Sequence, residues 1–368
     1  MLKFISDKII QCGDYVYTKW TDTTVVKLIK EDGTVKKEYV KIDKTEFYTT
    51  LPSCTDIVSI EGLEKLTKLN TLHCSGSKIK SFEDFKLPET LKSLRCNNNQ
   101  HITLKGIPDS VETLICSNSK LKTLDNLPKS LKYLICYNNE ISSITNLPKG
   151  LKKLDCSHNK IKYLEKLPEG LEELICNNNE IEYLTLSSNL VRLSCSQNKL
   201  KRLDNFSSGL EKINCSFNDI GFLGKLPKWL NELDCRNNEI TSLENLPSDL
   251  KILRCSNNKI TLLDLKNCSY IRYLDFSNNK MTSLSGIPLL VTGMIFEGNP
   301  LEHINGIECA KDPLGYINEC VIIKHYKHNP QDLNLSPEEK ETKEKEIMKN
   351  RNVLKSFQIL LDPFLEFY

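Results

Sequence analysis

The sequence repeats itself at intervals of about twenty residues through most of its length. Residues 127–146 (LPKSLKYLICYNNEISSITN) are followed directly by residues 147–166 (LPKGLKKLDCSHNKIKYLEK), and the two segments match position by position. Such self-similarity predicts stacked copies of one supersecondary unit rather than several independent domains. Cysteine occupies one column of the repeat, at Cys74, Cys96, Cys116, Cys136, Cys156, Cys176, Cys195, Cys215, Cys235 and Cys255, and Phe276 and Phe296 continue it.

Leucine and cysteine two residues apart define the apolar face of each repeat. In a β-strand, residues i and i+2 point to the same side. Leu134 and Cys136 therefore point inward together, while Tyr133, Ile135 and Tyr137 point outward. One such strand cannot bury its apolar side alone, but stacked copies form a parallel sheet over one shared core. The sequence therefore predicts an α/β solenoid.

The remainder of each repeat is short for a helix between two turns. Leu-Pro pairs restrict φ where the chain turns back, as at Pro128 and Pro148, so we expect an extended or 3₁₀-like return. A second column lies three residues after the cysteine, and its amides are expected to bond backbone groups and to form a ladder between coils. Its members are Ser77, Asn99, Ser119, Asn139, Asn159, Asn179, Asn198, Asn218, Asn238, Asn258, Asn279 and Asn299.

The unit L-x-x-L-x-C-x-x-N-x-I-x-x-L-x-x-L-P-x-x resembles the leucine-rich repeat family, whose consensus is L-x-x-L-x-L-x-x-N/C-x-L. The resemblance covers residues 51–308. The Leu-Pro pairs are similar to those of the short bacterial-type subfamily that includes YopM and the repeat arms of IpaH-like ubiquitin ligases. The Lys-, Asn- and Ile-rich composition also resembles repeat proteins of giant DNA viruses. The resemblance implies a horseshoe with its parallel sheet on the concave face and a mostly non-helical convex side.

The 15 cysteines would suit a disulfide framework in a small secreted chain. However, their number is odd, and Asp7 and Lys8 interrupt the only apolar run near the start. We therefore expect a reducing compartment and buried free thiols, because cysteine behaves as a small apolar side chain. Disulfides between coils and a thiolate metal ladder are the alternatives. Parallel side chains in register are poorly aimed for a disulfide, and zinc needs ligands converging on a point.

Caps are expected because the open ends of a solenoid expose its core and strand edges. Residues 1–50 are predicted to form a β-rich N-terminal cap, since two β-rich runs flank Asp32-Gly33, a hairpin signal; a separate binding module is the alternative. Residues 51–308 are predicted to form the leucine-rich repeat solenoid, with about 12 strands. Residues 309–368 are predicted to form a helical C-terminal cap, with helices beginning near Asp312 and Ser336. Its apolar stripe either packs on the last repeat or binds a partner.

The sequence shows no pattern for catalysis or for a cofactor. A phosphate-binding glycine loop, H-E-x-x-H and G-x-S-x-G are all missing, and too few residues follow the repeats for an IpaH-like catalytic domain. A cluster of possible ligands, Cys309, Cys320, His325 and His328, departs from zinc-finger spacing, so we expect no metal. Lys+Arg is 50 and Asp+Glu is 48, which does not favour nucleic acid or anionic membrane. No stretch approaches the length of a membrane span.

The outward positions of the strands are the candidate binding surface. Several are apolar in the first half of the repeats, interrupted by Lys153, Asp155 and Glu173. Aromatic residues with aliphatic neighbours are typical interface anchors, although scattered exposed apolar residues are also common. The second half is charged but mixed, which does not suit phosphates. The predicted partner-binding residues are Ile115, Tyr133, Ile135, Tyr137, Ile175, Asp234, Arg236 and Arg254.

These observations predict a non-catalytic, monomeric scaffold that binds a protein partner on the concave face. The expected location is the cytoplasm, or the host cytoplasm if the chain is viral or an effector. One alternative is an adaptor subunit of an enzyme complex such as a ubiquitin ligase. The other is a structural component of a virion.

Overall fold

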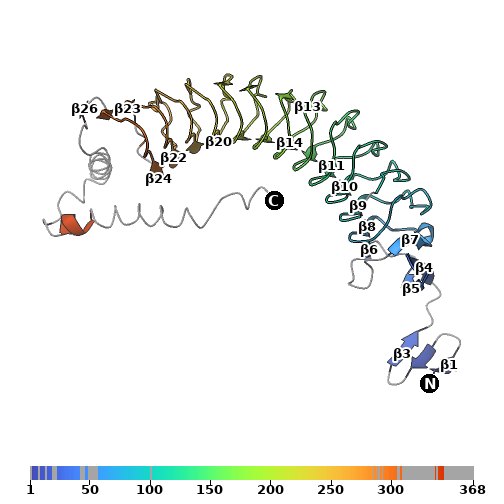
Figure 1. Cartoon of the computed structure of the whole chain (residues 1–368). Coiled ribbons are helices and arrows are strands. Elements are labelled where there is room, and N and C mark those ends of the chain that lie inside the picture. The colour runs from blue at the N-terminus through green and yellow to red at the C-terminus, as the bar shows by residue number, and fades with distance from the viewer. Residues whose placement is uncertain are drawn as a thin grey trace. The chain divides into compact units, whose positions relative to one another are not determined.

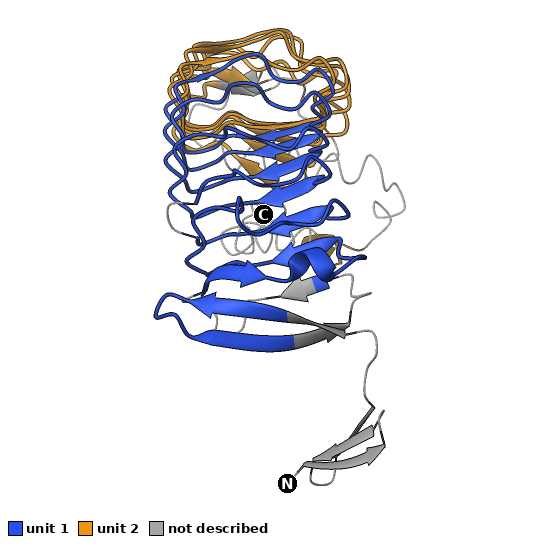
Figure 2. Ribbon diagram, turned by 90° about the vertical axis from the view of Figure 1, so that its right-hand side faces the viewer, with its two compact units in different colours: residues 1–180 blue, residues 181–368 orange. Residues whose placement is uncertain are grey.

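The structure is a computed structural model. It describes residues 2–6, 9–12, 15–18, 23–41, 46–48, 57–99, 102–284, 286, 288, 291, 293–304, 307–308, 336 and 339–343. The chain forms two compact units, Met1–Glu180 (unit 1) and Ile181–Tyr368 (unit 2), which are coloured separately in Figure 2. The predicted boundaries after residues 50 and 308 stay predictions.

Unit 1 is a stack of coils, and most coils contribute one short strand to a parallel sheet (Figure 2). The sheet order is β6-β8-β9-β10-β11-β12-β14. Its strands are β6 (Glu46–Tyr48), β8 (Thr71–His73), β9 (Ser93–Arg95), β10 (Thr113–Ile115), β11 (Tyr133–Ile135), β12 (Lys153–Asp155) and β14 (Glu173–Ile175). These strands lie on the inner, concave side of the stack, and the connecting segments lie on its outer side (Figure 1).

The N-terminal part of unit 1 is antiparallel. β4 (Thr23–Lys30) and β5 (Val35–Lys41) form a hairpin whose turn contains Asp32 and Gly33, with Gly33 at a φ of 82°. β4 also pairs with β7 (Ile57–Glu61), which is followed by the 3₁₀ helix η2 (Leu63–Lys65). A separate three-stranded sheet contains β1 (Leu2–Ser6), β2 (Ile9–Cys12) and β3 (Tyr15–Thr18).

Unit 2 repeats the same coil. Its part of the parallel sheet has the order β16-β18-β20-β21-β22-β24. These strands are β16 (Arg192–Ser194), β18 (Lys212–Asn214), β20 (Glu232–Asp234), β21 (Ile252–Arg254), β22 (Tyr273–Asp275) and β24 (Gly293–Ile295). Near the C-terminus, residues 339–343 are helical. Ser336 and Glu339 exchange hydrogen bonds of 2.8 and 3.3 Å there, which is the reciprocal pattern of a capping box.

Among the described residues, the outer sides of both units carry turns and short strands that form sheets of two or three strands. The two-residue strands are β13 (Tyr163–Leu164) in unit 1 and, in unit 2, β15 (Tyr183–Leu184), β17 (Arg202–Leu203), β19 (Phe222–Leu223), β23 (Ser283–Leu284), β25 (His303–Ile304) and β26 (Ile307–Glu308). At the Leu-Pro pairs the Pro carbonyl accepts a hydrogen bond from the backbone nitrogen three residues later; the nitrogen of Leu131, for example, donates to the carbonyl oxygen of Pro128 at 3.2 Å. This i to i+3 bond is the expected 3₁₀-like turn.

The core follows the two columns that the repeat predicts. Leu134 and Cys136 have no exposed surface, and every column cysteine from Cys74 to Cys255 is a fully buried free thiol. Phe276 and Phe296 continue the column with stacked rings whose centroids are 6.2 Å apart. The predicted parallel-sheet solenoid is confirmed.

The asparagine column forms the expected ladder. Asn139, for example, donates from Nδ2 to the carbonyl oxygens of Cys116 and Cys136 at 3.1 and 2.9 Å. Its Oδ1 accepts from the backbone nitrogen of Leu121 at 3.0 Å. Each such amide ties one coil to the preceding coil and satisfies buried backbone groups that the short strands leave unpaired.

A left-handed residue two positions after the column cysteine completes the turn. Asn138 has a φ of 54° and Asn237 has a φ of 54°. Glycine and asparagine tolerate this region best, but Phe217 occupies it in one coil with a φ of 54°. We did not identify this constraint in the sequence, although Gly76 and Gly298 in the same column indicate it.

Candidate functional site

Four of the predicted partner-binding residues lie together on the concave side of unit 1. β10 and β11 pair in parallel with Ile115 opposite Ile135, and Tyr133 opposite Thr113. Tyr133 and Tyr137 are 45% and 36% exposed, whereas Ile115 and Ile135 are half-buried. We call Ile115, Tyr133, Ile135 and Tyr137 the aromatic patch. Its side chains extend away from the core that Leu134 and Cys136 fill.

Ile175 lies on the same side but offers little surface. It is in register with Asp155, which is in turn in register with Ile135. The side chain of Ile175 is only 6% exposed, because its neighbours cover it. An outward direction along the strand was predictable for this residue, but its burial was not.

The predicted charged residues of unit 2 form an ordered ion-pair cluster. Arg236 clamps Asp234 with Nε at 3.0 Å from Oδ1 and Nη2 at 2.8 Å from Oδ2, and Asp234 is only 4% exposed. Hydrogen bonding to Asp234 raises the pKa of Arg236 against the opposing effect of burial. Arg254 Nη1 lies 3.1 Å from Glu232 Oε1, and its guanidinium stands 5.1 Å from the ring centroid of Tyr273. These charges therefore compensate one another within the chain.

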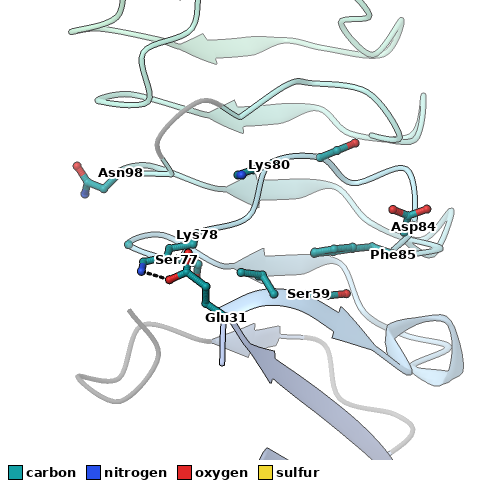
Figure 3. A pocket seen from close by; sticks show the side chains of 11 residues that line it. Glu31, Ser59, Ser77, Lys78, Lys80, Asp84, Phe85 and Asn98 are labelled. Atoms are coloured by element: carbon teal, nitrogen blue, oxygen red, sulfur yellow. Dashed lines mark hydrogen bonds and ion pairs between the residues drawn. The ribbon is translucent and has the colours of Figure 1, made fainter. Parts of the chain in front are cut away.

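A hollow of about 690 Å³ lies beside the first coils of unit 1 (Figure 3). Its lining includes Ser77, Lys78, Asp84, Phe85 and Asn98. Lys78 turns toward Glu31 and forms an ion pair with it, while Asp84 and Asn98 lie at opposite ends of the view (Figure 3). The labelled polar groups do not converge on one point, so the hollow lacks the focused polar groups of a typical small-molecule site.

Exposed aromatic side chains also occur outside the inward-facing strands. Tyr183 and Phe222 project from the outer strands β15 and β19 of unit 2, and Trp229 and Tyr270 lie in turns before the sheet strands. Their exposed fractions are between 54% and 63%. We did not single them out in the sequence, because the outer positions of the repeat have no strand pattern that indicates direction.

Among the described residues, no group of three or more His, Cys, Asp or Glu side chains could hold a metal ion. The cluster of Cys309, Cys320, His325 and His328 lies outside the described part of the chain. In that described part, no helix has the length and hydropathy needed to cross a membrane. Burial raises the pKa of Cys74, Cys116 and Cys195 to about 12, so these thiols are not activated nucleophiles.

No protein-family model and no curated protein match the chain. Solved structures do. YopM from Yersinia enterocolitica WA-314 is 30% identical over 68% of this chain, with a TM-score of 0.55, and the chain spans 60% of that protein. The leucine-rich effector protein YopM from Yersinia pestis is 25% identical, with 73% of this chain and 70% of that chain covered and a TM-score of 0.53. An internalin, InlF from Listeria monocytogenes str. 4b F2365, is 18% identical with a TM-score of 0.58, covering 74% and 90% of the two chains, and this likeness concerns the fold alone.

Proposed function

We propose that this chain, which has the fold of the leucine-rich repeat proteins, is a non-catalytic scaffold that binds a protein partner on the concave face of unit 1. The observation that carries the proposal is the aromatic patch. Tyr133 and Tyr137 stay exposed on a surface where packing does not require them, because Leu134 and Cys136 fill the core beneath. Tyrosine is enriched among the residues that dominate binding energy in protein interfaces.

The surroundings of the patch support a protein partner. Half-buried aliphatic side chains at Ile115 and Ile135 lie between polar strand ends, which matches an interface with an apolar centre and a polar rim. Lys153 and Glu173 form an ion pair of 2.8 Å at the border of this region. The structural relative from Yersinia pestis is described as a leucine-rich effector protein.

The charged cluster of unit 2 is proposed as a second, polar contact region. Asp234, Arg236 and Arg254 are held in place by partners within the chain, so they contribute specificity more than affinity. Paired charges of both signs do not form the continuous positive surface that phosphate backbones require. We therefore favour a protein over a nucleic acid as the ligand.

The proposal is tested by affinity purification from the native host with the wild-type chain, with a Tyr133→Ser/Tyr137→Ser variant, and with Tyr163→Ser as a matched control. Tyr163 is 53% exposed in unit 1 but lies on the outer strand β13. The double variant is expected to unfold at nearly the wild-type temperature, since exposed substitutions usually change stability by less than about 0.5 kcal/mol. Its affinity for the captured partner should fall at least about tenfold, or ~1.4 kcal/mol.

Equal capture by all three proteins would contradict the proposal and would make the outer aromatic residues of unit 2 the next candidates. Loss of binding in the Tyr163→Ser control alone would also contradict it. Unfolding of the double variant would show that the patch is structural.

A further inference from the structure

Asp155 occupies an unusual place beside the aromatic patch. It is the last residue of β12, and the parallel register places it between Ile135 of β11 and Ile175 of β14. Its carboxylate is half-buried on the concave side. A charged group is therefore held between two aliphatic side chains, where its hydration is incomplete and an ionised carboxylate is costly unless it is compensated.

The other carboxylates of the inward-facing strands are compensated within the chain. Glu173 pairs with Lys153 at 2.8 Å, Asp234 is clamped by Arg236, and Asp275 accepts from the hydroxyls of Ser256 and Ser277 at 2.8 and 2.7 Å. Asp155 accepts from the backbone nitrogen of Ser157 at 3.1 Å and forms no ion pair with any described residue. Burial raises the pKa of Asp155, and the hydrogen bonding of Ser157 and the charges of Lys153 and His158 offset that rise only in part.

Ser157 adds a second polar group whose hydrogen bonding is incomplete at the same place. Its buried Oγ makes no hydrogen bond of good geometry among the described residues, although it lies close enough to the Asp155 carboxylate to lower the pKa of that group. The equivalent serine of a later coil, Ser277, uses its hydroxyl to bond the equivalent aspartate at 2.7 Å. Buried polar atoms with incomplete hydrogen bonding are rare in native proteins, and each one calls for an explanation.

Unit 2 contains the arrangement that the patch lacks. Arg254 ion-pairs with Glu232 at 3.1 Å while its guanidinium stands 5.1 Å from the ring centroid of Tyr273. A carboxylate and an exposed tyrosine together provide both interactions that a guanidinium makes. In unit 1 the carboxylate of Asp155 and the exposed rings of Tyr133 and Tyr137 are present, and the nearby Lys153 forms its ion pair with Glu173 and not with Asp155.

We propose that Asp155 selects partner segments that present a basic side chain, arginine above all, to the border of the aromatic patch. The guanidinium meets the carboxylate of Asp155 and supplies donors for the Ser157 hydroxyl, and the aliphatic stem packs on Ile135. The tyrosine rings provide cation–π contact. This inference rests on the proposed function, because it specifies what the same concave face of unit 1 binds.

The experiment selects short random peptides on the wild-type protein, on Asp155→Asn, and on Asp109→Asn as a control. Asp109 is an exposed carboxylate in the same unit that pairs with Lys129 at 2.7 Å. Peptides selected by the wild type and by the control are expected to be enriched in arginine, and the Asp155→Asn selection is expected to lose this enrichment. Titration calorimetry then compares a selected peptide with its Arg→Gln version. The change should weaken binding to the wild type at least about tenfold and should leave binding to Asp155→Asn nearly unchanged.

Two results would overturn the inference. One is a set of wild-type peptides without basic enrichment, and the other is equal loss on the Arg→Gln change in both proteins. The Tyr133→Ser/Tyr137→Ser variant separates this failure from that of the proposed function. Peptides that need the tyrosines but no arginine refute only the role of Asp155. Peptides that bind without the tyrosines, or a selection that yields none, refute the concave-face proposal as well.

Discussion

Replacing Asn139 with alanine is expected to destabilise the protein far more than the same change one coil further on. The Asn139 Nδ2 donates to the carbonyl oxygens of Cys116 and Cys136, and its Oδ1 accepts from the backbone nitrogens of Ser119 and Leu121 at 2.9 and 3.0 Å. Of these four backbone groups, only the Cys136 carbonyl has a second hydrogen-bond partner among the described residues, the Nδ2 of Asn159 in the next coil at 3.1 Å. Three buried groups of the described structure therefore lose their partner.

Asn159→Ala is the matched comparison. The Asn159 Nδ2 donates to the carbonyl oxygens of Cys136 and Cys156, and an asparagine of an adjacent coil donates to each of these as well, at 2.9 and 3.0 Å. Its Oδ1 accepts from the backbone nitrogen of Ile141 at 3.0 Å. Among the described residues, the backbone nitrogen of Ile141 is the one group that Asn159→Ala leaves without a partner.

The expected difference in stability between the two variants follows from the number of backbone groups that each leaves without a partner. Asn139 and Asn159 are buried alike, at 8% and 9% exposure. A buried polar group that loses its partner costs about 1–3 kcal/mol. Asn139→Ala should therefore lower the free energy of unfolding by at least about 3 kcal/mol, and Asn159→Ala by about 1 kcal/mol. Ser119 accounts for the part of this difference that comes from the Cys116 carbonyl, because its short side chain donates to the Ser117 carbonyl at 3.0 Å and does not reach that of Cys116.

Urea denaturation followed by circular dichroism measures the loss of unfolding free energy in both variants. The slope of that free energy against urea concentration is compared between the variants, because repeat arrays can depart from two-state unfolding. Ser119→Asn in the Asn139→Ala background should recover about 1 kcal/mol, since the new amide can donate to the Cys116 carbonyl. Equal losses for the two alanine variants, or no recovery, would refute the reasoning that the ladder acts by sharing each carbonyl between two amides.

Three further predictions concern the core, one turn and the pH dependence. The thiol of Cys136 should react slowly with a thiol reagent in the native protein and quickly in urea, because burial raises its pKa; Cys136→Ser should cost about 1–3 kcal/mol, and rapid native labelling would contradict its place in the core. Phe217→Asn should stabilise by about 1 kcal/mol in thermal unfolding, since Phe217 is left-handed with a φ of 54°; a loss of stability would mean that the ring makes a compensating contact. Asp155→Asn should raise stability at neutral pH, because burial raises the pKa of Asp155 in the folded state above its ordinary value of 3.8 and ionisation therefore opposes folding. That gain should disappear as the pH falls below 3.8, where the carboxyl is protonated in both states, and a pH-independent difference would argue against a titrating Asp155.

The repeat by itself determined the architecture, because its information is local. Alternation within Leu134-x-Cys136 sets which side chains point inward, and the recurrence of the pattern every twenty residues requires that coils stack in parallel. The same logic placed Ile115 beside Ile135, as the register confirms, and predicted that Tyr133 and Tyr137 point outward, where both side chains are exposed. The asparagine ladder was predictable for the same reason, since each amide stands at a constant distance from the same backbone groups.

Tertiary structure alone decided how much of each outward side chain is accessible and which charges compensate one another. Ile175 and Tyr133 both point away from the core, yet only the tyrosine is exposed, because coverage depends on side chains from neighbouring coils. Asp234 and Asp155 end strands in the same way, but Asp234 is clamped by Arg236, whereas Asp155 lies between two isoleucines and forms no ion pair with a described residue. Ion pairing depends on rotamers and on contacts between coils, which a repeat pattern does not encode.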